Sequence, residues 1–186
     1  MRIVAGAQRG RRLVTPTGLE VRPTTDRVRE AIFNALGSLG ATEDARVLDL
    51  FAGSGALGIE ALSRGAAHVT FVDSSPKALA AVRANLEACG AEDSTAVVRA
   101  DALAYVERDG ERVDLALLDP PYGFDDWPRL LGALRADVMV IESDRPIDPG
   151  AAAEVVRERR YGGTVVTIAR CTGRDDLDRD TSEDRT

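Results

Sequence analysis

From residue 46 onward, short apolar runs alternate with longer segments whose apolar residues recur at helical spacing. The runs are rich in Val, Leu and Ile, which is typical of buried strands, and the longer segments are typical of amphipathic helices. The predicted strands span 46–51, 69–73, 95–99, 113–118 and 137–142, and the predicted helices span about 56–64, 76–89, 102–108 and 126–135. This alternation predicts an α/β fold with a doubly wound, mostly parallel sheet.

The pattern changes near the carboxyl end of the chain. Two strand-like segments, Ala153 to Arg160 and Thr164 to Arg170, flank the dipeptide Gly162-Gly163. A glycine pair in this position is a strong signal for a two-residue β-hairpin. Because no helix separates the two segments, we expect the hairpin to place one antiparallel strand in the otherwise parallel sheet.

The amino-terminal region predicts a β-arm followed by a helix. Residues 2–5 and 11–14 flank the segment 6–10, which predicts an arm with a basic, glycine-containing tip. Residues 22–26, with the sequence RPTTD, are expected to be extended and then to cap a helix through Thr or Asp. The predicted apolar face of that helix consists of Val28, Ile32, Ala35, Leu36 and Leu39. Arg27 and Arg29 are predicted to lie outside this face.

These patterns divide the chain into three expected parts. Residues 1–24 form the basic β-arm, and residues 25–171 form one α/β domain that begins with the small helix. Residues 172–186 form an acidic tail, in which residues 174–186 hold six acids against three arginines. Because the tail has almost no apolar residues, we expect it to be disordered.

Composition narrows the class of protein. Hydrophobic residues make up 44 % of the 186 residues and aromatic residues only 4 %, so the core must be mainly aliphatic. We expect a cytoplasmic protein, because there is no membrane-length apolar run, no secretion signal and no closely spaced cysteine pair. His68 is the only histidine, which excludes His-based triads and ordinary histidine metal clusters. We therefore expect no metal.

Charge is distributed unevenly along the chain. The net charge is −7, yet residues 1–30 hold seven arginines against three acids. A basic end on an acidic body can orient a protein on a polyanion such as RNA. Phosphate contacts and a merely solvated arginine-rich arm fit the pattern about equally well. The candidate RNA-binding residues are Arg2, Arg9, Arg11, Arg12, Arg22 and Arg27.

The strand predicted at 113–118 leads directly into the sequence Asp119-Pro120-Pro121-Tyr122. Two prolines force the chain into a stiff, extended turn, at the sheet edge where ligands of open α/β sheets bind. The Asp119 carboxylate and the Pro120 carbonyl accept hydrogen bonds and could hold both hydrogens of an exocyclic amine. Tyr122 offers a face for stacking a base. The alternative is an ordinary tight turn with an exposed acid.

A glycine-rich loop follows the first predicted strand. Gly53, Gly55 and Gly58 match the pattern G-x-G-x-x-G, and Asp73 ends the next strand. This pattern is also that of a dinucleotide site. However, Asp49 precedes the loop and would repel a pyrophosphate. A cofactor that carries a sulfonium and an ammonium group, S-adenosylmethionine, would be attracted instead.

Further acids extend this row. Asp101, followed by Ala102, ends the third predicted strand and is placed to meet an adenine amine. Each acid by itself has a simpler interpretation as a helix cap or a solvated turn residue. Carboxylates at successive strand ends nevertheless share one edge of a parallel sheet, which favours a common cofactor site.

The chain resembles the RsmD family, bacterial methyltransferases that modify the exocyclic N2 of a guanine in small-subunit ribosomal RNA. The resemblance covers residues 1–170 and includes MRIVAGAQRGRRL at the start, VLDLFAGSGALGIEALSRGA at 47–66, LDPPYG at 118–123 and ERRYGGTVV at 158–166. Glycine loops and DPPY turns occur in many amine methyltransferases. The segment RPTTDRVREAIFNAL at 22–36 is more particular to this family.

The resemblance implies a Rossmann-like class I methyltransferase fold and a role for each matched residue. Asp119, Pro120 and Tyr122 would hold the target base, while Arg22 and Thr24 lie in a segment that would close over the site. The cofactor would contact Asp49, Phe51, Gly53, Ser54, Gly55, Asp73, Asp101, Ala102 and Asp119. The chain departs from the family in its acidic tail and in its use of arginine, since Lys77 is the only lysine.

The predicted function is methyl transfer from S-adenosylmethionine to a guanine N2 in 16S ribosomal RNA, on an assembled or assembling small subunit. We expect direct in-line displacement by a monomeric enzyme that does not bind membranes. One alternative is an adenine-N6 methyltransferase of DNA or RNA, because the DPPY turn does not distinguish the two purines. The other is an NAD(P)-binding oxidoreductase or nucleotide-binding module that uses the glycine loop.

Overall fold

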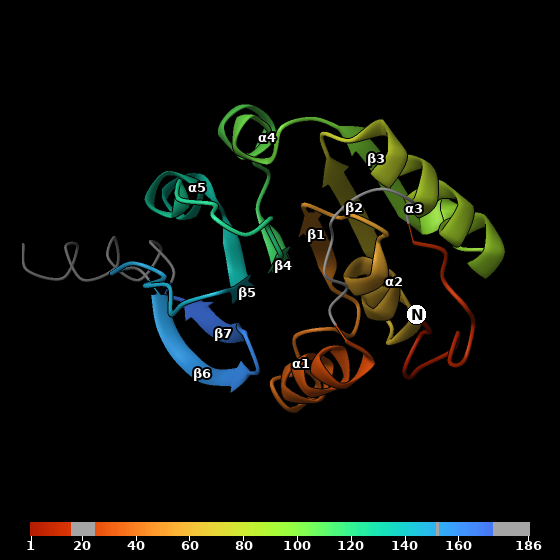
Figure 1. The fold of residues 1–186 in the computed structure, drawn as a ribbon, viewed down its shortest axis with the longest axis horizontal. Coiled ribbons are helices and arrows are strands. Elements are labelled where there is room, and N and C mark those ends of the chain that lie inside the picture. Colours follow the sequence, from red (N-terminus) through yellow and green to blue (C-terminus); the bar gives the residue numbers. More distant parts are fainter. Residues whose placement is uncertain (16–24, 152, 173–186) are drawn as a thin grey trace, which may run out of the picture.

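The computed structural model describes residues 1–15, 25–151 and 153–172 (Figure 1). Its centre is a seven-stranded sheet with the order β3-β2-β1-β4-β5-β7-β6. The strands are β1 (Arg46–Leu50), β2 (His68–Asp73), β3 (Thr95–Arg99), β4 (Val113–Leu118), β5 (Ala136–Ser143), β6 (Ala153–Tyr161) and β7 (Thr164–Cys171).

The strand directions confirm the predicted topology. Strands β1 to β5 pair in parallel. Strand β7 is antiparallel to both of its neighbours, β5 and β6. The Gly162-Gly163 hairpin therefore inserts one antiparallel strand, because its strands are joined without a crossover helix.

Helices cover both faces of the sheet (Figure 1). Helices α1 (Asp26–Ser38), α2 (Ala56–Ser63) and α3 (Pro76–Cys89) share one core cluster with Val47 and Phe71. Helices α4 (Ala102–Asp109) and α5 (Trp127–Ala133) share the cluster on the other face with Leu48. A short 3-10 helix, η1 (Glu92–Ser94), precedes β3. Adjacent residues of β1 thus point into different cores, as the alternation of a strand requires.

The helix boundaries follow from local chemistry. Thr25 caps α1, since its Oγ1 accepts from Val28 N at 3.3 Å, which confirms the predicted cap. Ser75 caps α3, which has Pro76 in its first turn and ends at Gly90 with φ 62°. These are the residue types that begin and end helices most readily.

The strand order creates a switch point at the centre of the sheet. From β1 the chain builds outward through β2 to β3, and it then crosses to β4 on the other side of β1. The connections after β1 and β4 therefore leave in opposite directions. A crevice at such a point, outside the carboxyl ends of the strands, is the usual ligand site of this architecture.

The amino-terminal arm is a hairpin that belongs to the core. Ile3 N donates to Arg11 O at 3.0 Å, and Leu13 N donates to Met1 O at 3.1 Å. Ile3 and Leu13 are only 2 % and 5 % exposed and join the cluster formed with α1, α2 and α3. The arm is thus held by buried apolar side chains, while its arginines lie at the surface.

A buried ionic cluster fastens the arm to α2. The Glu60 carboxylate accepts from Val4 N at 2.8 Å, from Ala5 N at 3.0 Å and from Arg64 Nε at 2.8 Å. Arg29 lies at the same place, with Nε 3.5 Å from Glu60 Oε2 and an Nη2 donor to Arg2 O. The prediction that Arg29 lies outside the buried helix face is wrong, because the arm and Glu60 supply partners that make a buried charge tolerable.

The arm also requires a glycine at one position. Gly6 has φ 81°, and a Cβ there would lie 1.7 Å from the carbonyl oxygen of Ser63. The close approach lets Ala7 N donate to Ser63 O at 2.7 Å and Gln8 N donate to Ser63 Oγ at 2.9 Å. Gly6 therefore permits backbone contact between the arm and the end of α2.

Among the helices of the described ranges, none has the length and apolar character needed to cross a membrane.

Candidate functional site

The loop between β1 and α2 is tightly turned. Phe51, Gly53 and Gly55 have φ values of 62°, 56° and 77°. The left-handed conformation is favourable for glycine and uncommon for phenylalanine, so Phe51 is held there by its surroundings. The left-handed conformation of Phe51 also explains why β1 ends at Leu50, one residue before the predicted end. Gly55 is the N-cap of α2, so the free amides of that helix begin at this loop.

Gly58, the third glycine of the pattern, serves packing. A Cβ at this position would lie 2.3 Å from Phe71 Cε1 and 2.8 Å from Val69 Cγ1. Only glycine lets α2 approach β2 this closely. The amide of Gly58 donates to Asp49 Oδ2 at 2.9 Å, so the carboxylate in β1 also satisfies the first turn of α2.

Asp49 is a buried acid, with 1 % of its surface exposed. Burial raises the pKa of Asp49 well above its ordinary value, the Gly58 hydrogen bond lowers it, and the charges of Asp119 and Asp73 raise it further. These three carboxylates lie at or just after the carboxyl ends of β1, β2 and β4, which are neighbours in the sheet. A cation at this place would relieve their repulsion.

Asp73 joins the glycine loop to the end of β2. Its Oδ2 accepts from Gly53 N at 2.9 Å, and its Oδ1 accepts from Ser75 N at 2.8 Å. The backbone adds a second link, because Ala52 N donates to Val72 O at 3.1 Å. The side chain remains partly exposed, so Asp73 can meet a ligand at this edge.

Asp101 caps α4, since its Oδ1 accepts from Ala104 N at 3.0 Å. The side chain is exposed, and the following Ala102 is buried. Ala100 N donates to Asp73 O at 3.2 Å, which ties the ends of β2 and β3 together. Asp101 is thus the N-cap of α4, which was one of the interpretations of its position in the sequence. It lies at the same edge of the sheet as Asp73.

The turn after β4 presents acceptors and an aromatic ring. Asp119 and Pro120 are partly buried, and Tyr122 is 57 % exposed. Phe124 N donates to Pro121 O at 3.2 Å, and Gly123 has φ 81°, so the chain reverses directly after the tyrosine. The turn leaves the ring of Tyr122 accessible beside the acceptors.

Aromatic contacts connect this turn to the glycine loop. The ring of Phe51 lies edge-to-face with Phe124 at 5.3 Å between centroids. Phe124 makes a similar contact with the buried Trp127 of α5 at 5.2 Å. Such pairs add about 0.5–1.5 kcal/mol beyond area burial. The predicted cofactor loop and the predicted base-binding turn are therefore packed against each other.

The candidate RNA-binding arginines fall into different groups. Arg9, Arg12 and Arg27 are exposed. Arg2 and Arg11 are also exposed, but each donates to a backbone carbonyl, of Gly10 and Ala88 respectively. Arg22 lies outside the described residues, as does Thr24 of the same predicted segment.

Asn85 is a residue of this region that the sequence patterns did not single out. It is 1 % exposed in α3, and its Nδ2 donates at 2.9 Å both to Ser54 O in the glycine loop and to Val14 O in the arm. Its Oδ1 accepts from Val14 N at 2.8 Å. The available signal was a polar residue on the apolar face of a predicted helix, flanked by Val82, Leu86 and Cys89.

Comparison with known proteins places this arrangement in a family. The family described as Conserved hypothetical protein 95 matches residues 1–170. A Bacillus subtilis relative named "Putative rRNA methyltransferase YlbH" is 38 % identical over 186 residues, which cover 93 % of this chain and 100 % of the relative. The Escherichia coli "Ribosomal RNA small subunit methyltransferase D" is 41 % identical over 122 residues, which cover 66 % of this chain and 60 % of the relative.

A solved structure supports the same assignment. The "Putative methyltransferase yhhF" of Escherichia coli superposes with a TM-score of 0.83 at 32 % identity and covers 94 % of this chain and 99 % of its own. The sheet order with its carboxyl-terminal antiparallel hairpin is that of the class I methyltransferase fold. The chain belongs to the Conserved hypothetical protein 95 family, the RsmD family of S-adenosylmethionine-dependent methyltransferases.

Proposed function

We propose that this protein transfers a methyl group from S-adenosylmethionine to the N2 amine of a guanine in 16S ribosomal RNA, on an assembled or assembling small subunit. The observation that carries the proposal is the placement of Asp49, Asp73 and Asp119 at the carboxyl ends of three adjacent strands, with Asp73 bound to Gly53 N and Asp49 bound to Gly58 N. A site built from carboxylates favours a cationic ligand next to an amine. The names of the relatives support RNA as the substrate class.

The residues present suit S-adenosylmethionine, which supplies an activated methyl group on a sulfonium. Asp49 and the positive end of α2 would face its charged methionine part, and Asp73 would accept from its ribose hydroxyls. Asp101 and Ala102 would lie beside its adenine, with Phe51, Ser54 and the glycines forming the floor. A dinucleotide fits less well, because its pyrophosphate would meet the buried acid of β1.

The turn after β4 would position the nucleophile. Asp119 and the Pro120 carbonyl would accept the two hydrogens of the exocyclic amine, while Tyr122 would stack on the purine. This grip directs the nitrogen lone pair at the methyl carbon. The bound cofactor would supply its sulfonium methyl group to this nitrogen and leave as S-adenosylhomocysteine, and water or Asp119 would take up the proton that the amine loses. Positioning and electrostatics would supply most of the rate enhancement.

Adenine N6 in DNA or RNA is the second candidate substrate, because both purine amines fit two acceptors and a stacking ring. The name of the Escherichia coli relative, "Ribosomal RNA small subunit methyltransferase D", supports small-subunit ribosomal RNA as the substrate. The choice of guanine over adenine rests on the resemblance to the RsmD family. A basic arm beside a single domain offers little surface for reading a long sequence. The fold of the substrate is therefore expected to contribute to recognition.

The test is transfer of labelled methyl groups to small subunits from a strain that lacks this protein, followed by identification of the methylated nucleoside by mass spectrometry. We expect N2-methylguanosine at one site and little transfer to a short naked hairpin. N6-methyladenosine as the product would replace the guanine assignment with the second candidate. Binding of NAD in place of S-adenosylhomocysteine, measured by calorimetry, would contradict the methyltransferase proposal altogether.

A further inference from the structure

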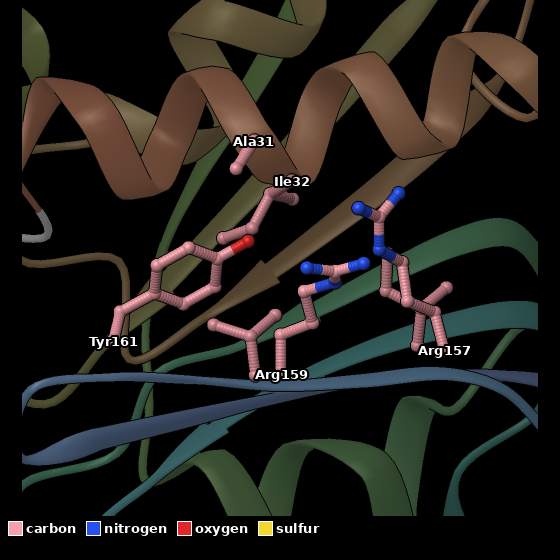
Figure 2. A pocket seen from close by; sticks show the side chains of 7 residues that line it. Ala31, Ile32, Arg157, Arg159 and Tyr161 are labelled. Atoms are coloured by element: carbon pink, nitrogen blue, oxygen red, sulfur yellow. The ribbon is translucent and has the colours of Figure 1, made fainter.

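A groove lies between α1 and the β6–β7 hairpin, away from the glycine loop. It is lined by Ala31 and Ile32 of α1 and by Arg157, Arg159 and Tyr161 of β6, with Val166 and Ile168 of β7 beneath them. Figure 2 shows both arginine side chains rising from β6 toward the helix, with Ala31 and Ile32 opposite and the ring of Tyr161 beside them. The groove has an apolar floor and a cationic side.

A β-bulge determines which side chains of β6 face this groove. The pairing with β7 shifts between Val155 and Arg157, so Arg157 lies opposite Ile168 and Arg159 lies opposite Val166. Without the extra residue, alternation would turn Glu158 toward α1. Instead Glu158 faces the opposite side, where it accepts from Thr167 Oγ1 at 3.2 Å. The bulge therefore replaces an acid in the groove with two arginines.

Several arginines of the described residues pair with an acid, but these two do not. Arg112, Arg129 and Arg145 are exposed and each pairs with an acid at 2.6 Å. Within residues 1–15, 25–151 and 153–172, neither Arg157 nor Arg159 forms an ion pair. Around them, the hairpin segment 153–172 holds four arginines against two glutamates in a chain of net charge −7. Unpaired guanidinium groups on a local basic excess fit a polyanion.

The direction of β6 relates the groove to the candidate site. Because β7 is antiparallel to β5 and to β6, strand β6 runs in the direction of β5, and Tyr161 ends at the same edge as the DPPY turn. In the register, Arg159 pairs with Val166, which pairs with Glu142 near the end of β5. Three strand spacings separate β6 from β4, roughly 15 Å at about 4.8 Å each. Nucleotides that flank a base held at the turn can span this length.

We propose that the groove between α1 and the β6–β7 hairpin binds the phosphate backbone of the substrate RNA next to the target nucleotide, with Arg157 and Arg159 as the phosphate ligands. This inference rests on the proposed function. The groove would be a second RNA-binding surface, in addition to the amino-terminal arm. Arg27 extends the same surface, since it lies one helical turn before Ala31. The apolar floor can pack against ribose and base edges. A purely ionic surface patch would contact the phosphates only.

The test compares the double variant Arg157→Gln/Arg159→Gln with Arg160→Gln. Arg160 lies on the same strand and is exposed, but alternation places it on the face away from α1, so it is the matched control. For unmethylated small subunits, we expect the double variant to raise Kd about 10–100-fold. The salt slope, which is the dependence of the logarithm of the binding constant on the logarithm of salt concentration, should fall in magnitude by about two, one per lost phosphate contact. KM for the subunits should rise, while kcat at saturation and the Kd for S-adenosylhomocysteine should stay within about twofold.

The charge-preserving variant Arg157→Lys/Arg159→Lys should recover most of the affinity and the full salt slope. Equal affinity and slope for the double variant and Arg160→Gln would overturn the proposal. Weaker binding to subunits with unchanged binding to naked 16S ribosomal RNA would overturn it as well, because the groove would then hold a protein. If wild-type protein transfers no methyl group to any subunit, the proposed function fails first. Wild-type transfer with unaffected variants would refute the groove alone.

Discussion

Asn85 Nδ2 donates to the carbonyl oxygen of Ser54 at 2.9 Å, so a buried amide of α3 holds the glycine loop from behind. The same amide group is paired with both backbone groups of Val14. Ser54 is linked to the arm a second time, because its Oγ lies 4.0 Å from Met1 Sδ. The arm and the glycine loop thus share one support.

Replacing Asn85 with leucine should loosen both attachments. Leucine fills similar volume but leaves the Val14 amide and the Ser54 carbonyl without partners, which costs about 1–3 kcal/mol per buried group. We expect a lower melting temperature and an S-adenosylhomocysteine Kd about tenfold weaker by calorimetry, a change of about 1.4 kcal/mol. Arg83→Ala on the exposed side of α3 is the control. An Asn85→Leu protein that is destabilised but binds with unchanged affinity would exclude the positioning role.

Asp49→Asn should change how stability depends on pH. Because the pKa of Asp49 is raised in the folded protein, the folded state keeps a proton that the unfolded state loses above about pH 4. The free energy of unfolding of the wild type should therefore fall as pH rises from there through the raised pKa. The asparagine variant should lack this decline, since its amide oxygen still accepts from Gly58. Urea denaturation between pH 4 and pH 8 measures the difference, and parallel curves would contradict the interpretation.

Asp119→Ala should impair turnover far more than cofactor binding. Removal of one positioned acceptor costs about 10²–10³ in rate for comparable electrostatic groups. Single-turnover methyl transfer measures the chemical step, and calorimetry with S-adenosylhomocysteine measures binding. Asp125→Ala removes an exposed acid from the same loop, where it pairs with Arg145, and should leave turnover nearly unchanged. Near wild-type transfer by Asp119→Ala would rule out its proposed role.

Gly58→Ala should destabilise the protein through its contact with Phe71. The added methyl would lie 2.3 Å from the ring, and overpacking of this kind costs about 1–3 kcal/mol. In a domain of this size each kcal/mol lowers the melting temperature by about 2–4 °C. The control is Gly37→Ala in α1, where an added Cβ would have no atom within 4 Å apart from its own helix and chain neighbours. This substitution should raise the free energy of unfolding by about 0.4–1 kcal/mol. Equal effects of both substitutions on thermal unfolding would be inconsistent with the close packing of α2 on β2.

Gly6→Ala should detach the arm from α2. The new Cβ would overlap the Ser63 carbonyl at 1.7 Å, which neither backbone can accommodate in place. Gly10→Ala is the matched control, because its φ of 83° is equally unfavourable for alanine but nothing lies within 4 Å. We expect faster hydrogen exchange across residues 1–15 and weaker RNA binding only for the Gly6 variant. If the two variants exchange alike, the contact with Ser63 does not hold the arm.

The elements of this fold follow closely from local pattern. Strand and helix boundaries agree within a few residues, because burial on one or both faces imposes periods of two and 3.6 on the sequence itself. The largest difference is α5, predicted over 126–135 and found over Trp127–Ala133, since Leu134 is already extended toward β5. The row of acids at the strand ends was also predictable, because the carboxyl ends of parallel strands share one edge.

Contacts between segments that are distant in the sequence could not be predicted from local sequence pattern. Helical spacing alone places Arg29 outside the apolar face, yet Arg29 is buried. Glu60, 31 residues away in sequence, and Arg2 of the arm, 27 residues away, lie against it in space. The packing of Phe51 on Phe124 and the bulge in β6 depend likewise on neighbours from other segments.

The sequence by itself therefore determined the order of elements, the candidate chemistry at the sheet edge and the family. The tertiary structure decided which polar residues are buried, how the arm supports the glycine loop and which arginines face the groove beside α1. The physical reason is that periodicity and turn chemistry act over a few residues. The pairing of buried charges and amides depends instead on which distant segments meet when the core closes.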